Sequence, residues 1–205
     1  MNTFPIMLGL RGRRTVVVGA GPVGLRKARS LRRAGAAVKV VDPLADPEAL
    51  PDGVEAVRAA YEPEHVAGAF LVFACTDDAG LNARVAADAR SAGALVNVAD
   101  TPDECDFYLP AMFRAGCVEV AVGTGGSVPA LSAWLRRGLE AALPEKLAEF
   151  AAALEDARIE LRAAEPDVAR RMAVMKQLVR DETHRAFLDA GPAAVRAELH
   201  RLLGG

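Results

Sequence analysis

The stretch Thr-Val-Val-Val-Gly-Ala-Gly-Pro-Val-Gly-Leu-Arg-Lys-Ala, residues 15–28, decides the fold of this chain. Its first four residues are β-branched and predict a buried parallel strand, and the glycine spacing then predicts a turn into a helix that reaches about residue 34. Gly19 permits the tight turn, Gly21 has no Cβ and lets the backbone approach a pyrophosphate, and Gly24 lets helix and strand pack closely. The pattern is typical of a dinucleotide-binding turn, in which free N–H groups at the helix start face the anion.

A carboxylate follows the next predicted strand. That strand, residues 37–41, ends at Asp42, eighteen residues after Gly24. A carboxylate at this place can accept hydrogen bonds from the ribose hydroxyls of adenosine and repels a 2′-phosphate, so the sequence predicts NAD rather than NADP as cofactor. An aspartate in a loop after a strand that binds no nucleotide is the alternative interpretation.

Length, charge and cysteine usage bound the class of protein. A chain of 205 residues, 52% of them hydrophobic, can hold a nucleotide domain and a smaller appendage. The formal net charge of -2 argues against a nucleic-acid partner. Three cysteines without a CxxC pair and three isolated histidines indicate neither disulfides nor a metal site, which favours a cytoplasmic protein. No stretch approaches the roughly 20 apolar residues that would span a membrane.

Strand and helix patterns alternate up to about residue 100. The sequence predicts a loop with one short helical turn over 43–53, then strands at 54–58, 69–75 and 94–99 and a helix at 79–91 capped by Asp77 or Asp78. Alternation of this kind predicts a parallel α/β sheet, whose ligands bind beyond the carboxyl ends of the strands. We therefore expect Gly19, Asp42, Thr76 and Asp100 to converge on one crevice.

The pattern changes after residue 105. Residues 107–113 and 117–122 predict an antiparallel hairpin whose exposed apolar side chains need a cover, and a second subunit is the expected cover. A helix follows with Ser127 as its expected N-cap and ends before Pro144; one face carries Leu131, Trp134, Leu135, Leu139 and Ala142.

The last sixty residues are predicted to be helical. Two apolar stripes predict the core of a helix bundle: Leu147, Phe150, Leu154, Ala157 and Leu161 in the first, and Val168, Met172, Met175 and Val179 in the second. The fold class is thus α/β: a Rossmann-like NAD-binding domain over 1–105, a dimerisation hairpin-helix region over 106–143 and a C-terminal helical domain over 144–205.

Two places carry candidate chemistry. Asp100 ends a central strand, where a carboxylate beside an oxidised nicotinamide can take a proton while hydride leaves the substrate; a turn-forming aspartate is the alternative. Gly125, Gly126 and Ser127 precede a helix start, and their backbone N–H groups suit a substrate carboxylate or phosphate; a flexible connector is the alternative.

Four motifs together resemble the siroheme synthase N-terminal module, the precorrin-2 dehydrogenase family, some of whose members are also sirohydrochlorin ferrochelatases. They are 18–28, 74–78 with Asn82, 97–100 leading to 105–107, and 123–130. The resemblance implies NAD-dependent oxidation of precorrin-2 to sirohydrochlorin by a homodimer whose central region forms the intersubunit contact.

The resemblance also implies roles for single residues. Asp100 matches the essential aspartate of the family, and Ser127 matches the serine of a glycine-rich turn at the substrate crevice. Backbone positions that line NAD in the family are matched by Pro22, Val23, Pro43 and Leu44. The family often has alanine at the position of Gly24, and we expect this departure to be harmless.

Other functions remain open at this point. A non-catalytic NAD-sensing regulatory module would share the nucleotide turn but needs no anion cradle beside a proton acceptor. Another small NAD oxidoreductase could act on a different acidic substrate. The C-terminal helices leave ferrochelatase activity open.

Overall fold

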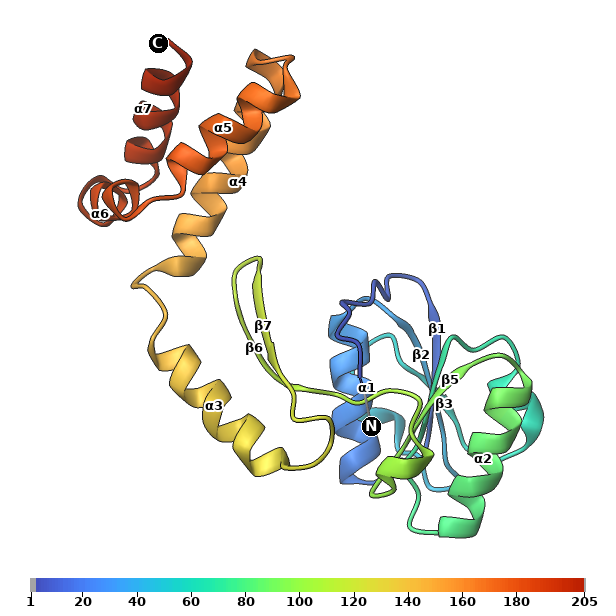
Figure 1. Cartoon of the computed structure of the whole chain (residues 1–205). Coiled ribbons are helices and arrows are strands. Elements are labelled where there is room, and N and C mark those ends of the chain that lie inside the picture. Colours follow the sequence, from blue (N-terminus) through green and yellow to red (C-terminus); the bar gives the residue numbers. More distant parts are fainter. Residues whose placement is uncertain (1–2, 205) are drawn as a thin grey trace. The chain divides into compact units, whose positions relative to one another are not determined.

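The computed structural model describes residues 3–204 and divides the chain into two compact units, Met1–Leu109 and Pro110–Gly205 (Figure 1). The first unit contains the nucleotide turn and a parallel sheet, and the second contains a hairpin and five helices. The three-domain division with boundaries at 105/106 and 143/144 stays a prediction.

Five parallel strands build the first unit. Their order across the sheet is β3-β2-β1-β4-β5, so the order reverses between β1 and β4, as it does in doubly wound nucleotide-binding folds. The strands are β1 (Arg14–Val18), β2 (Ala37–Val41), β3 (Glu55–Val57), β4 (Leu71–Ala74) and β5 (Leu95–Val98). In register, Val17 of the central strand lies between Val40 and Phe73.

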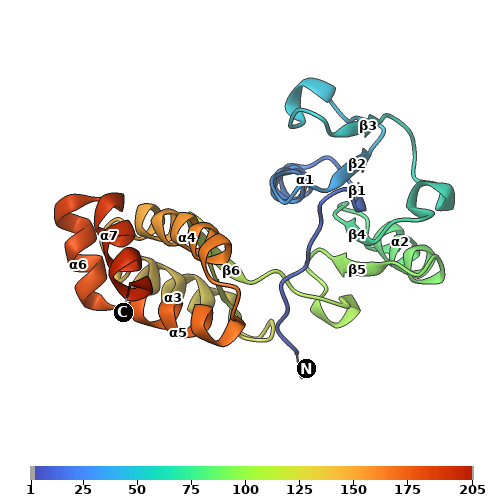
Figure 2. The same ribbon diagram turned by 90° about the horizontal axis from the view of Figure 1, so that it is seen from above.

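Helices cover both faces of this sheet, which explains why the central strands β1 and β4 carry runs of buried apolar residues (Figure 2). Val17 packs in one core cluster with Ala28 and Leu31 of α1 (Pro22–Arg33). Val16 packs in the other with Val85 and neighbouring residues of α2 (Ala79–Ser91). Short 3-10 helices occupy the connections: η1 (Pro47–Ala49), η2 (Pro63–Val66) and η3 (Pro102–Glu104). The predicted α/β class is confirmed.

The second unit begins with β6 (Ala111–Ala115) and β7 (Val118–Val122), an antiparallel hairpin against which α3 (Pro129–Ala141) packs (Figure 1). The hairpin tip contacts the next helix: a Cβ on Gly116 would lie 3.1 Å from the carbonyl oxygen of Ala148. The Cys117 thiol, also at the tip, donates to Glu155, and this hydrogen bond raises the thiol pKa because it stabilises the protonated form.

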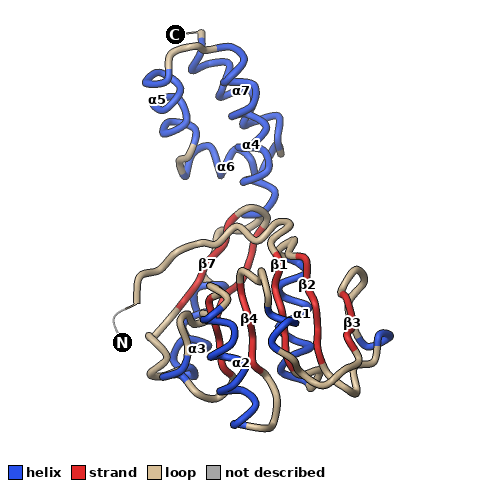
Figure 3. The backbone as a smooth tube through the Cα atoms, turned by 90° about the vertical axis from the view of Figure 1, so that its right-hand side faces the viewer, coloured by secondary structure: helices blue, strands red, loops and turns tan. Residues whose placement is uncertain are grey.

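Four helices complete the second unit (Figure 3). They are α4 (Leu147–Ala164), α5 (Val168–Leu178), α6 (Asp181–Ala190) and α7 (Pro192–Leu203). Their core is built from Phe150 and Leu161 of α4 with Leu178 and Leu199 from α5 and α7. The first predicted stripe therefore faces the core as expected.

The second predicted stripe is only partly correct: Met175 packs against the core of the helices, but the other three residues do not. Val168, Met172 and Val179 are exposed, and α5 instead buries Val174 and Leu178. At about 100° per residue, Val174 and Leu178 are rotated by roughly 120° from the predicted stripe, and Met175 lies between the two sets. Both faces of α5 are apolar enough to serve as core, and the packing against α4 and α7 selects the one that periodicity did not.

Candidate functional site

The candidate site lies at the carboxyl edge of the parallel sheet. Hydrogen bonds extend the strand pairing beyond the strand ends: the Gly19 amide donates to the Val41 carbonyl at 2.9 Å, and the Cys75 amide donates to that of Val18 at 2.8 Å. The Ala99 amide donates to Ala74 at 2.9 Å in the same way. The segments that start at Gly19, Asp42, Thr76 and Asp100 are therefore brought together at one edge of the first unit.

Each glycine of the turn has its own physical reason. Gly19 has φ +104, and a Cβ there would lie 2.5 Å from the Cys75 carbonyl oxygen. A Cβ on Gly24 would collide with the carbonyl oxygen of Gly19, so this backbone requires glycine at that position. A Cβ on Gly21 meets nothing within 4 Å, because it would point into the open space where a pyrophosphate is expected.

The helix start fits a diphosphate. Within residues 3–204, the amides of Gly21, Val23 and Gly24 donate to no acceptor, while the Ala20 amide donates to Asp42. Unpaired donors at the first turn of a helix, together with its dipole, favour a bound anion. The residues present therefore fit the dinucleotide that the sequence predicts.

Asp42 has a role that the sequence did not reveal. Its carboxylate accepts one hydrogen bond per oxygen, from the amides of Ala20 and Leu44, both at 2.7 Å. It thereby ties the glycine turn to the loop after β2. Each oxygen keeps further accepting capacity, so the carboxylate can still receive a ribose hydroxyl.

Thr76 forms the turn after β4 together with a buried asparagine of α2. Asn82 accepts from the Thr76 amide at 3.1 Å and donates through Nδ2 to the Thr76 carbonyl at 2.9 Å. The Thr76 hydroxyl lies 2.8 Å from Asn82 Oδ1, and Asp78 caps α2 by accepting from the Leu81 amide. Polar groups of Thr76 are thus used within the turn, and its contact with a cofactor stays a prediction.

Asp100 is exposed at the end of β5 and has φ +59, a left-handed conformation that is uncommon for a residue other than glycine. Strained backbone of this kind persists where the surroundings enforce it, and it gathers at functional sites. Asp100 also lies close enough to the buried Cys75 thiol to act on it electrostatically; burial is the larger cause that raises the pKa of Cys75 to about 11.

A segment that folds back on β5 holds this strand end in place. The outer amides of the edge strand are satisfied by side chains: Val96 donates to the Asp106 carboxylate at 2.8 Å, and Val98 donates to the Cys105 sulfur at 3.2 Å. Asn97 Nδ2 donates to the Phe107 carbonyl at 3.0 Å. We call residues 101–107 with these contacts the β5 clamp. The sequence motif contains the residues of the β5 clamp, but it did not predict the hydrogen bonds between them.

Lys27 is a further residue that the sequence analysis did not select. It follows Gly24 by three positions and therefore lies on the inward face of α1, with Nζ 5.6 Å from the centre of the Phe73 ring. Burial lowers the Lys27 pKa, and within residues 3–204 it forms no ion pair. A lysine at this spacing from the last glycine is the signal that could have identified it.

Gly125, Gly126 and Ser127 belong to the second unit, and their orientation toward the crevice stays a prediction. Both glycines have positive φ, and the expected N-cap role of Ser127 is wrong: the N-cap is Val128. The two left-handed residues turn the chain so that Thr124 lies beneath the helix start, where its Oγ1 accepts from the Val128 amide at 3.2 Å. The Ser127 hydroxyl donates to the Thr124 carbonyl at 2.8 Å.

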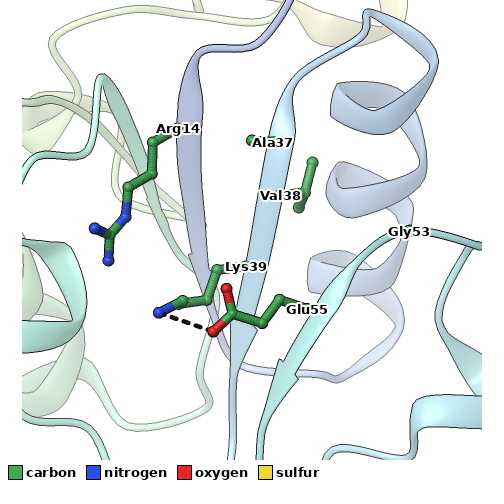
Figure 4. Close-up of a pocket in the computed structure, with 6 residues that line it drawn as sticks. All are labelled: Arg14, Ala37, Val38, Lys39, Gly53 and Glu55. Atoms are coloured by element: carbon green, nitrogen blue, oxygen red, sulfur yellow. Dashed lines mark ion pairs between the residues drawn. The ribbon is translucent and has the colours of Figure 1, made fainter.

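The opposite edge of the sheet carries a separate hollow of about 380 Å³ (Figure 4). It lies at the strand starts, beside Arg14, Ala37 and an ion pair of 3.0 Å between Lys39 and Glu55. Because ligands of such sheets bind at the carboxyl ends, this hollow is not the dinucleotide site.

Between residues 3 and 204, no group of three or more His, Cys, Asp or Glu side chains is placed to hold a metal ion. Among the helices in that range, none has the length and apolar character needed to cross a membrane.

The strand order, the glycine turn and the unpaired helix-start amides define a dinucleotide-binding domain of the Rossmann type. A sequence model of the family described as putative NAD(P)-binding matches residues 6–111, and the chain belongs to this family.

Relatives extend the similarity beyond the nucleotide domain. The chain is 38% identical over 208 residues to a siroheme synthase of Chromobacterium violaceum, a match that covers 98% of this chain and 44% of the relative. It is 35% identical over 207 residues to one of Thioalkalivibrio sulfidiphilus, with 99% and 42% covered. The chain thus spans less than half the length of these relatives, and the resemblance to siroheme synthases is confirmed.

A solved structure shares the whole fold. The protein titled SirC, precorrin-2 dehydrogenase, superposes with a TM-score of 0.80 over 97% of this chain and 100% of that chain, at 20% sequence identity. The arrangement of parallel sheet, hairpin and C-terminal helices is therefore common to both proteins.

Proposed function

We propose that this chain catalyses the NAD-dependent oxidation of precorrin-2 to sirohydrochlorin. The similarity to siroheme synthases runs over nearly the entire chain, and the fold is that of a precorrin-2 dehydrogenase. The observation that carries the proposal is the left-handed Asp100 at the carboxyl edge of the sheet, on the same edge as the glycine turn. A nucleotide sensor has no need of a strained acidic residue at that place.

The residues that would hold NAD are those of the glycine turn and of the loop after β2. The amides of Gly21, Val23 and Gly24 would bind the pyrophosphate, and the Asp42 carboxylate would accept from the adenosine ribose. Leu44, whose side chain is 85% exposed, offers apolar surface to the adenine side of the site with Pro43. The negative charge of Asp42 disfavours a 2′-phosphate, so NAD is the preferred cofactor. Bound NAD supplies an acceptor for the hydride.

The remaining chemistry belongs to the chain itself. Oxidation of precorrin-2 removes a hydride and a proton, and the Asp100 carboxylate is the group that takes the proton. The left-handed backbone and the β5 clamp fix the place from which it does so. Amides at Gly125 and Gly126 would bind carboxylates of the substrate, and the Ser127 hydroxyl would join them by exchanging its hydrogen bond to the Thr124 carbonyl.

Measurements of turnover and of NAD affinity distinguish a proton-acceptor role of Asp100 from a structural role. The Asp100→Asn variant keeps the size of the side chain and its tolerance of the left-handed conformation but removes its charge. Incubated with precorrin-2 and NAD, it should form NADH at least about 100-fold more slowly than the wild type, with NAD affinity within about twofold. Unchanged turnover removes Asp100 from the mechanism.

The same assay tests two further parts of the proposal. NADP in place of NAD should support slower oxidation, because Asp42 repels its additional phosphate. Ferrous iron added after the oxidation is complete tests for ferrochelatase activity through the change in the pigment spectrum. No conversion of precorrin-2 by the wild-type chain with either dinucleotide would refute the proposed function.

We also propose that the chain acts as a cytoplasmic homodimer. The apolar face of α3 is exposed in the single chain, with Trp134 63% exposed and Leu131, Leu135 and Leu139 exposed along the same helix. An uncovered apolar surface next to a two-stranded hairpin is what a subunit contact requires.

A further inference from the structure

A groove of about 490 Å³ runs between α4 and α5 in the second unit. Its apolar surface includes Leu161, Met172 and Met175, and four cationic side chains line it: Arg158, Arg162, Arg171 and Lys176. No acidic side chain lines it. The groove belongs to none of the segments assigned above to the dinucleotide or to the substrate.

The cations of the groove are largely uncompensated. Arg171 donates to the carbonyls of Glu165 and Pro166, both at 2.8 Å, and so holds the connection between the two helices. In the described part of the chain, Arg158, Arg162 and Lys176 form no ion pair. Glu160 of α4 pairs with Arg196 and His200 of α7, and Glu165 in the connection pairs with Arg170.

Part of the apolar surface of the groove is exposed, whereas Leu161 and Met175 also belong to the helix core. Met172 is 58% exposed and Val168, also on the lining, is 59% exposed. These are residues of the stripe that periodicity assigned to the bundle core. Methionine side chains are flexible and polarisable and adapt to the shape of a bound apolar body.

The helix geometry places the charges around this surface. α4 runs toward the connection at 165–167 and α5 runs away from it, so Arg162 and Arg171 lie near the connection. Arg158 and Lys176 follow about one further turn along each helix. An apolar surface lined by four cations suits a flat apolar molecule that carries several carboxylates on its rim, since guanidinium groups bind carboxylates in a bidentate manner.

We propose that the α4/α5 groove is a second tetrapyrrole site, which binds the polycarboxylate macrocycle that the oxidation releases. The identity of the ligand rests on the proposed function, whereas the ligand class rests on the groove itself. Its volume falls within the range of about 300–1,000 Å³ that small-molecule sites occupy. Charge complementarity with an anionic ligand accounts for the cations that have no partner within the chain.

Calorimetric titration of the full chain with uroporphyrin, a stable macrocycle with carboxylates around its rim, tests the site. Arg162→Glu reverses one charge of the rim, and Met172→Glu places an anion on the apolar surface. Each should weaken uroporphyrin binding at least about tenfold. Arg185→Glu is the matched control: its side chain is 70% exposed on α6, outside the groove, and binding should stay within about twofold.

Three results would overturn the proposal: no uroporphyrin binding by the wild type, an equal loss in the groove and control variants, or tighter binding of an acidic amphipathic peptide that displaces the macrocycle. Circular dichroism confirms that each variant is folded. Precorrin-2 turnover, measured on the same variants, keeps the two proposals apart. A wild type that binds uroporphyrin in the groove but does not oxidise precorrin-2 contradicts the proposed function and leaves the groove as a polycarboxylate site.

Discussion

At the scale of single residues, Gly21 and Gly24 lie three positions apart in one turn and have different roles. Gly24 is required by the fold, because any Cβ there meets the backbone of Gly19. Gly21 has room for a Cβ in the chain alone, so its absence of a side chain matters only when a ligand is present. Sequence spacing marks both glycines equally and does not separate these roles.

Alanine at each position separates stability from cofactor binding. Gly24→Ala should lower the free energy of unfolding by about 1–3 kcal/mol, because overpacking displaces the turn. Gly21→Ala should leave it within about 0.5 kcal/mol and weaken NAD binding at least about tenfold. Urea unfolding followed by circular dichroism and titration with NAD measure the two effects. Equal losses of stability in both variants would contradict the assignment.

At the scale of elements, the outer edge of β5 is closed by side chains where another strand would otherwise lie. Asp106 and Cys105 accept the amides of Val96 and Val98, so the β5 clamp completes the hydrogen bonding of an edge strand. The clamp also connects strand stability with the position of Asp100, since both depend on the same short segment.

Replacement of Asp106 tests the clamp. Asp106→Ala leaves the Val96 amide without an acceptor and should lower the free energy of unfolding by about 1–3 kcal/mol. Asp106→Asn keeps an acceptor and should recover most of this loss. The ion pair between Asp106 and Arg90 is also removed in both variants, but partly exposed pairs of this kind contribute little. Equal denaturation midpoints for the alanine and asparagine variants would show that the hydrogen bond is unimportant.

At the scale of the whole molecule, the second unit leaves large apolar side chains exposed, among them Leu131, Trp134, Leu135 and Leu139 of α3. The hairpin has only two strands, and the outward face of α3 carries large apolar side chains. This is the region that the sequence analysis assigned to subunit contact.

Light scattering after size-exclusion chromatography tests the dimer. Trp134→Glu should convert the wild-type dimer into a monomer, because it buries an unpaired charge in the contact. Ile159→Glu is the control: Ile159 is 68% exposed on α4, outside the predicted contact, and the variant should stay dimeric. NAD binding should persist in both, since the dinucleotide residues belong to the first unit. A monomeric wild type would contradict the proposal.

The sequence predicted the first unit more completely than the second, for a physical reason. Turn glycines, caps and buried strands are local signals, and the helix over residues 79–91 and the strand over 37–41 have the predicted bounds. The buried face of α5, the N-cap at Val128 and the contacts of Asp42 depend on which residues meet across the fold. Hydrophobic periodicity and residue spacing are local patterns and do not predict these tertiary contacts.

The two backbone hydrogen bonds accepted by Asp42 affect any attempt to redesign cofactor preference. The usual exchange of such an acidic residue for a neutral one, made to admit a phosphorylated ribose, would also release the Ala20 and Leu44 amides. A successful redesign must therefore supply new acceptors for both amides before it adds a basic side chain for the phosphate.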